Sequence, residues 1–463
     1  MTWLIVSREI REFYRDGRFL FGAGLIVVLF VTAFLVGFEQ RKNVFSEREV
    51  AQQLDYDDWV NQPERHPHDA AHQGMHVFKP IPPLSFVDPG ITNYVGSTQW
   101  LQAHRQTEVK FRPAQDATGL QRFGSLTPAW IIQMLGPLLI IVLGFNSFSG
   151  EREQGTLRQL ISLGVPSWKL LVGKALALFL GALLLLAPLL MLAFWIAFGD
   201  VQAGDRYDVL IRLGLLVLGY LVYLGIYIFM VLTVSVLTPA SRISLVVLLA
   251  VWIAGTILAP RVLVDVARMV YPTPNQVEFN AQLNQELRKE YTKAWKEHFG
   301  VEDRWGTDVP LSRWGEALQV DDQAGYNAID RHFGALWNRY DDQQRLQEFF
   351  GFVFPMLSVR SYSMAITATD FSHHRDFAVS AEQHRRLMQN LISSELVEHA
   401  DGQGEHHFDY KVSKAFWSRI PPFEYAAPSV LFALQRSLNS FAIMCATLLF
   451  SFVFALLSSR KLV

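Results

Sequence analysis

The chain has 463 residues, of which 51% are hydrophobic and 18% are charged, and its formal net charge is −2. The apolar residues gather in long uninterrupted runs, so the composition favours a polytopic membrane protein over a soluble globular one. The near-neutral charge gives no reason to expect nucleic-acid binding. The single Cys445 excludes an intrachain disulfide framework, so any aqueous part must fold by packing alone.

Six apolar runs are long enough to cross a hydrocarbon core of about 30 Å, which takes about 20 helical residues. They predict membrane spans at residues 19–38, 127–148, 175–199, 213–238, 243–260 and 437–458. The first run is too long for a secretory signal, and FEQRKN follows it in place of a small-residue cleavage site. We therefore expect an uncleaved first span.

Basic residues beside the spans predict the orientation, because Lys and Arg concentrate in short cytoplasmic flanks. They precede the first span, lie between the second and third, and follow the last: Arg8, Arg11, Arg15, Arg18, Arg152, Arg158, Lys169, Lys174, Arg460 and Lys461. The acidic connection 200–212 fits the outer face. We expect both termini in the cytoplasm, with residues 1–18 as an amphipathic cytoplasmic segment.

This topology leaves two large segments on the outer side. Pro80, Pro82 and Pro83 predict a loop-rich segment at 39–126 with short helices at its ends. The stripe of Phe279, Leu283 and Leu287 predicts a mainly helical domain at 261–436.

Residues 349–366 are apolar enough to suggest a seventh span. Arg360 near the middle would cost about 2.5–3.5 kcal/mol at a bilayer centre, and a seventh span would send the last loop to the wrong side. An interfacial or re-entrant helix and a buried helix of the outer domain both stay open.

A charged amphipathic helix is predicted between the second and third spans, within residues 149–174. Glu151 and Glu153 fall in its first turn, where the helix dipole favours carboxylates. Leu157, Leu160 and Ile161 recur along one face. Such a helix can dock onto another protein.

Three stretches carry a resemblance to a known family. EREQGTLRQLIS at 151–162, followed by Gly173-Lys174, resembles the cytoplasmic coupling segment of ABC-2 type transporter permeases. HPHDAAHQGMHVFKPIPPLSFVDPG at 66–90 and SVRSYSMAITATDFSHHRDF at 358–377 resemble a bacterial branch with a soluble domain of unknown function, related to gliding-motility and nitrous-oxide-reductase maturation permeases. The resemblance implies an all-α, six-span, type V exporter-like permease of the bacterial inner (plasma) membrane, with a helical periplasmic domain.

The resemblance also implies a partner ATPase in two copies, which would bind ATP and Mg, and a second permease half, either a copy of this chain or a related permease. Membrane lipid and a periplasmic partner complete the expected contacts. The coupling residues would be Glu151, Arg152, Glu153, Gly155, Thr156, Leu157, Arg158, Leu160 and Ile161. Of these, Gly155 would permit close approach of the ATPase.

The chain lacks an ATPase site of its own. No GxxxxGK[ST] loop occurs, since Ala175 follows Gly173-Lys174 and Trp168 stands in place of the leading glycine. We therefore expect a permease that exports substrate and has no cofactor of its own. The alternative is a mechanotransmission or assembly module whose outer domain acts on an external partner without transmembrane transport.

Other mechanisms are disfavoured. The predicted spans contain no Asp, Glu, Lys, Arg or His, although ion-coupled carriers place such groups at membrane depth. A membrane enzyme is also disfavoured, because the sequence shows no recognisable nucleophile with its base and orienting group.

Two further clusters invite functional interpretations. Tyr220, Tyr223 and Tyr227 share one face of the fourth span, where they would line a substrate path or simply hydrogen-bond to neighbouring backbone. His66, His68, His72 and His76 crowd eleven residues, with His72 and His76 one helical turn apart, and imidazoles suit copper or zinc. We predict a polar loop without a metal site there. The alternative is that these four histidines bind copper or zinc.

Overall fold

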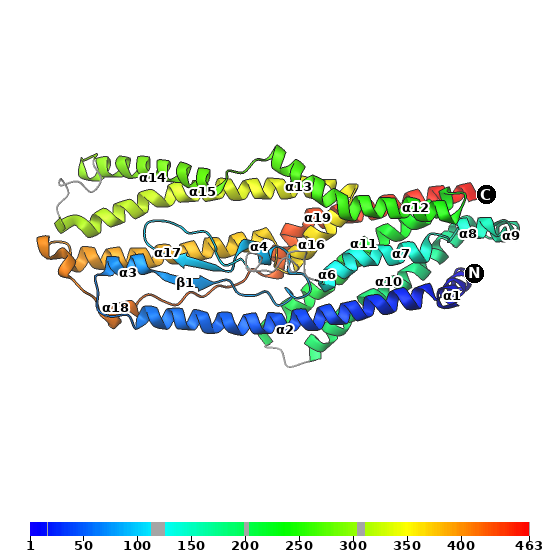
Figure 1. Ribbon diagram of the computed structural model, residues 1–463, viewed down its shortest axis with the longest axis horizontal. Coiled ribbons are helices and arrows are strands. Elements are labelled where there is room, and N and C mark those ends of the chain that lie inside the picture. The colour runs from blue at the N-terminus through cyan, green and yellow to red at the C-terminus, as the bar shows by residue number, and fades with distance from the viewer. Residues whose placement is uncertain (16, 113–125, 199–202, 303–310, 463) are drawn as a thin grey trace.

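The computed structural model describes residues 1–462 apart from 16, 113–125, 199–202 and 303–310. The molecule is elongated and mostly helical (Figure 1). Both termini lie at one end with helices α8 and α9, while the far ends of α14, α15 and α17 lie at the other. We call the first part the bundle and the second, built from the end of α2 and residues 61–112 and 271–425, the distal domain.

Six helical segments of the described chain are long and apolar enough to cross a membrane. They are Phe19–Val60, Pro128–Glu153, Ser167–Leu192, Arg206–Leu237, Ser241–Val270 and Val430–Leu462. The helices that form them are α2 (Arg18–Val60), α6 (Pro128–Trp130), the π-helical turn η2 (Ile131–Leu135), α7 (Gly136–Gly144), α8 (Ser149–Glu153), α10 (Ser167–Phe198), α11 (Ala203–Leu237), α12 (Ser241–Trp252), the π-helical turn η3 (Ile253–Leu258), α13 (Ala259–Val270), α19 (Val430–Ser459) and the 3₁₀ turn η7 (Arg460–Leu462).

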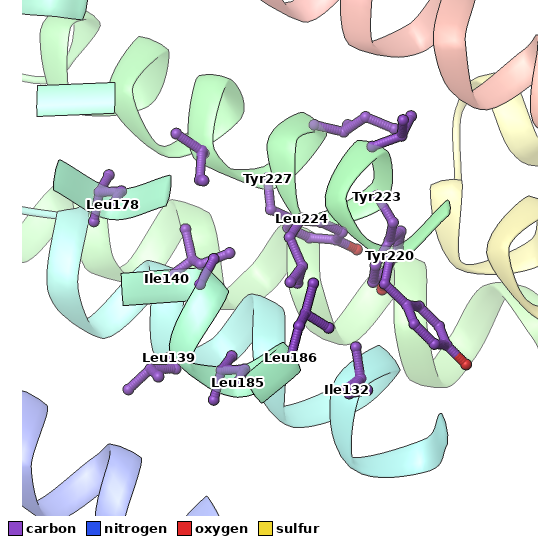
Figure 2. Packing of buried hydrophobic residues seen from close by; sticks show 14 of the residues in the cluster. Ile132, Leu139, Ile140, Leu178, Leu185, Leu186, Tyr220, Tyr223, Leu224 and Tyr227 are labelled. Atoms are coloured by element: carbon purple, nitrogen blue, oxygen red, sulfur yellow. The ribbon is translucent and has the colours of Figure 1, made fainter. Parts of the chain in front are cut away.

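Helix α11 lies at the centre of the bundle, with α7, α10, α16 and α19 packed around it. Figure 2 shows the apolar core between α7, α10 and α11, with Leu139 of α7, Leu185 of α10 and Leu224 of α11 among its side chains. Close approach depends on small residues: a Cβ added at Gly219 of α11 would lie 2.1 Å from the Tyr362 ring. The helix pairs are therefore held by complementary shape as well as by their apolar surface.

The distal domain is mostly helical. It contains α3 (Pro67–Gln73), β1 (Met75–Phe78), α4 (Thr92–Val95), β2 (Thr98–Leu101), α14 (Gln276–Phe299), η4 (Leu311–Arg313), α15 (Trp314–Phe349), η5 (Phe350–Phe352), α16 (Pro355–Ile366), α17 (Phe371–His399), η6 (Gly404–Asp409) and α18 (Lys414–Trp417). Helices α14 and α15 pack side by side, and α14 begins with a capping box between Asn275 and Glu278. The predicted stripe of Phe279, Leu283 and Leu287 is buried between them.

The segment after the first span differs from the prediction of a loop-rich chain. Helix α2 does not end near residue 38 but continues to Val60, because residues 39–60 hold neither proline nor glycine. After α3, strands β1 and β2 pair antiparallel, with Met75 opposite Leu101. The fold is therefore not purely helical. The part of this segment at 113–125 lies outside the described residues.

Residues 349–366 form no seventh span. Helix α16 has only 12 residues, and most of them are buried against α11 and α19. Its Arg360 is exposed, and Tyr362 donates a hydrogen bond to the carbonyl of Leu215 in α11 at 2.7 Å. The segment is thus a buried helix at the junction between the bundle and the distal domain.

Candidate functional site

The predicted coupling segment is two short helices rather than one. Helix α8 ends at Glu153, and α9 (Thr156–Ser162) begins after Gly155. Gly155 has φ 75°, a left-handed conformation that favours glycine, and an added Cβ would meet open space. Gly155 is therefore required within this chain by its backbone conformation, which breaks the predicted helix in two.

Helix α8 is fastened to the ends of α11 and α12. Arg152 donates to the carbonyls of Val236, at 2.8 Å, and Thr238. Glu153 accepts from the backbone N–H of Ser241 at 3.1 Å and from its hydroxyl at 2.7 Å, at the N-terminus of α12. These charges satisfy helix-terminal groups of the chain itself, so α8 is held to the bundle.

A buried ionic cluster joins α8 to α1 (Thr2–Arg15) and α10. The Lys174 ammonium, 2% exposed, donates to Glu9 at 2.6 Å and to Glu151 at 3.0 Å. Burial raises the pKa of Glu9, and the nearby Lys174 opposes that rise. Arg8 adds a contact of 3.5 Å to Glu151. We call Glu9, Glu151 and Lys174 the buried triad.

Glycine allows α1 to approach α10 closely beside this triad. A Cβ at Gly173 would lie 2.7 Å from Cγ2 of Ile5. The Gly173-Lys174 pair therefore has a packing role and an electrostatic role. Gly173 allows α1 to approach α10 closely, and Lys174 forms an ion pair with Glu9 of α1.

Helix α9 buries one face and exposes the other. Leu157 is buried, and Leu160 and Ile161 pack against the bundle core. Arg158 and Gln159 are exposed, and Leu163, just after α9, is 78% exposed. Of the nine predicted coupling residues, the apolar ones thus pack back onto the bundle. The free surface consists of Arg158, Gln159, Ser162 and Leu163, and we call it the α9 face.

The three tyrosines of α11 are buried in the bundle (Figure 2). Tyr220 shares a hydrogen bond of 2.7 Å with the Ser363 hydroxyl of α16, and Tyr223 donates to the backbone carbonyl of Gln133 at 2.7 Å. The Tyr223 and Tyr227 rings meet edge to face at 5.2 Å. This geometry favours the packing interpretation, since η2 and α16 contact the face on which a substrate path was predicted.

Comparison with known proteins decides the family. A family model described as ABC-2 family transporter protein matches residues 3–458. The chain belongs to this family. No curated protein and no solved structure matches the chain. It is accordingly a permease of an ABC transporter and a multi-pass membrane protein, and the family implies partnership with an ABC ATPase.

The two stretches that resemble a branch of ABC-2 permeases meet in space. The Ser363 hydroxyl donates to the Asp88 carboxylate, and the Ile91 N–H donates to the Thr369 carbonyl at 3.1 Å. Gly90, at φ 51°, has no room for a Cβ, which would lie 2.4 Å from the Thr369 hydroxyl. Burial raises the pKa of Asp88, and its bonds to Ser363 and to the Gly90 N–H oppose that rise.

The four histidines of the predicted alternative metal site do not form one cluster in the permease. Helix α3 ends at Gln73, and Gly74 turns the chain into β1, so His72 and His76 are not one helical turn apart as predicted. His76 instead pairs with Asp55 at 2.9 Å. His66 is buried with its ring 5.3 Å from that of His407.

Only His68 and His72 lie together, with their Nε2 atoms 3.1 Å apart. His104 joins them from the loop after β2. Sequence reasoning missed His104 because it lies far along the chain in a loop with no metal-ligand spacing.

Proposed function

We propose that this permease couples ATP hydrolysis by a separate ATPase subunit to export of a substrate across the bacterial inner membrane. The observation that carries the proposal is that α8 is bonded to the bundle, whereas one face of the adjoining α9 is exposed. The buried triad and the bonds of Arg152 and Glu153 fasten α8 to α1, α10, α11 and α12. The α9 face is left exposed beside it.

A force applied to the α9 face would reach the bundle without passing through a flexible linker. Leu157 inserts into the bundle core, and α8 contacts both α11 and α12. Because close-packed interiors transmit displacement, movement of α9 would shift these helices as rigid bodies. In this proposal Arg158 and Gln159 contact the ATPase. Glu151, Arg152 and Glu153 instead hold α8 to the bundle.

The arrangement of the chain supports the proposed orientation. The α8–α9 segment and both termini share one end of the molecule (Figure 1), as expected if that end is cytoplasmic. The distal domain then lies in the periplasm. Two ATPase copies would supply the ATP and Mg site, and a second permease half, a copy of this chain or a related one, would complete the transporter within membrane lipid.

A mechanotransmission module is the second candidate function. It is favoured by the burial of Tyr220, Tyr223 and Tyr227, which leaves no open path along their face. It is also favoured by the hydrogen bond between Tyr220 of α11 and Ser363 of α16, which ties the bundle to the distal domain. In that case ATP-driven movement of α11 would reshape the distal domain to act on a periplasmic partner. The two candidates share the α9 face.

Site-specific photo-crosslinking tests the shared step. A photoreactive phenylalanine analogue at Leu163, in cells that express the chain with its native partners, should crosslink to a protein that contains a GxxxxGK[ST] loop. The same analogue at Phe408, an exposed position in the distal domain, is the matched control. Crosslinks to such a protein from Phe408 but not from Leu163 would contradict the proposal.

Transport assays separate the two functions. In inverted vesicles that contain the whole complex, export predicts ATP-dependent uptake of substrate, and Arg158→Glu should reduce uptake and ATP hydrolysis together. Mechanotransmission predicts ATP hydrolysis without uptake. Charge reversal at Arg158 is preferable to reversal at Glu151 or Glu153, because those carboxylates bond to the chain itself.

A further inference from the structure

Three imidazoles converge on the surface of the distal domain. His68 and His72 lie one turn apart on α3, and the His104 ring lies 5.2 Å from that of His68 and 5.1 Å from that of His72, between ring centroids. Each of the three histidines offers a ring nitrogen, and these nitrogens all lie within 4.8 Å of one another. No other group of this kind occurs among the described residues.

The backbone around His104 is held in place rather than left free. The Ala103 N–H donates to the carbonyl of Ala71 in α3 at 2.9 Å, which ties the loop to the helix that carries the other two histidines. His104 has φ 65°, in the left-handed region. Such a conformation costs about 1–3 kcal/mol in a residue other than glycine and is concentrated at functional sites.

The ligand chemistry fits one class of ion. Neutral imidazole is a preferred ligand of zinc and copper, and three histidines with an open fourth position form a known zinc arrangement.

The geometry is close to what a tetrahedral ion requires. Zn–N bonds of about 2.0–2.1 Å place two ligand nitrogens about 3.4 Å apart, and the Nε2 atoms of His68 and His72 lie 3.1 Å apart. Since no pair of ligand nitrogens exceeds 4.8 Å, closing the site takes at most about 1.4 Å of movement of an imidazole.

A cavity of about 540 Å³ adjoins the three histidines. His68 and His104 line one side, and residues of α14 and α15, among them Tyr291 and Trp314, line the other. Arg105 and Arg288 also line it, so the positive charge of the cavity favours an anion as the fourth ligand of a bound ion.

We propose that His68, His72 and His104 bind one divalent transition-metal ion of the zinc and copper class, with its fourth coordination position open to this cavity. The inference is independent of the ATPase coupling proposed above. It places a metal site in the distal domain, remote from the α9 face.

Metal titration of the full chain in lipid nanodiscs tests the proposal. The chain should carry an affinity tag without histidines and be stripped with a chelator. Zn²⁺ and Cu²⁺ are then titrated separately by equilibrium dialysis and calorimetry, which identifies the preferred ion. One ion per chain is expected, and His72→Gln or His104→Gln should weaken binding at least about 100-fold, since even groups that only orient a metal ligand account for 10–100-fold.

The matched control is His406→Gln, an exposed histidine that pairs with Asp409 outside the cluster, and it should bind as the parent chain does. His72 is exposed, so its variant should fold, and circular dichroism with size-exclusion chromatography checks this. Failure of both ions to bind at one per chain would overturn the proposal. Full retention of binding in folded His72→Gln and His104→Gln would do the same.

Discussion

Removal of Lys174 is the most informative perturbation of the buried triad beside the predicted coupling segment. Lys174→Met keeps the length and apolar stem of the side chain but withdraws the one buried ammonium between Glu9 and Glu151. The side chains of these two glutamates are 7% and 9% exposed. Breaking a buried ion pair from one side typically costs about 3–5 kcal/mol, because a charge is left buried without a partner.

The matched comparison replaces the whole buried triad. A chain with Glu9→Leu, Lys174→Met and Glu151→Leu buries no charge at this position, and such exchanges are often neutral or stabilising. We therefore expect the free energy of unfolding of the triple variant to be several kcal/mol higher than that of Lys174→Met alone. The measurement is equilibrium unfolding in lipid nanodiscs, followed by tryptophan fluorescence.

The pH dependence of the single variant gives an independent check. Burial already raises the pKa of Glu9 with Lys174 present, and loss of the lysine removes an opposing influence. Since folding then favours the protonated carboxyl, the destabilisation of Lys174→Met should shrink as pH falls through the raised pKa and grow as pH rises. Equal stability of the single and triple variants at neutral pH would refute the reasoning.

Two further predictions concern packing at the junction and burial in the distal domain. Gly219→Ala places a Cβ 2.1 Å from the Tyr362 ring and should lower the unfolding free energy by about 1–3 kcal/mol. Gly214→Ala in the same helix is the control, because a Cβ there meets open space and should not lower it. Thermal unfolding measures both variants, and equal shifts would contradict this prediction. Burial lowers the pKa of Lys79 to about 8, so its cost of up to about 3 kcal/mol is fully present below pH 8 and disappears as pH rises towards 10.5. The stability advantage of Lys79→Met over the parent chain, measured by unfolding at several pH values, should fall across that window; an advantage that does not change with pH would contradict the assignment.

Local features of the sequence predicted local features of the structure. The apolar runs identified six helical segments able to cross a membrane, and the stripe of Phe279, Leu283 and Leu287 identified a buried helix face. Both depend on periodicity within one segment, which burial on one side imposes. The full length of α2 was missed because residues 39–60 are polar, and hydropathy alone does not tell a polar helix from a loop.

Contacts between distant residues were beyond the reach of pattern reasoning. Glu153 looked like a docking charge, but its partner Ser241 lies 88 residues away. Lys174 and Glu9 are separated by 165 residues, and neither has a local pattern that indicates the other. His104 belongs with His68 and His72 only because β1 and β2 pair and bring the loop after β2 back to α3.

The length of α2 has a mechanical consequence. Its 43 residues form one uninterrupted helix, about 64 Å long at a rise of 1.5 Å per residue. One end lies beside α1 and the other contacts β1 of the distal domain (Figure 1). A tilt of about 10° at the α1 end would swing the Val60 end through about 11 Å, so a slight movement at one end of this helix becomes a large displacement at the other.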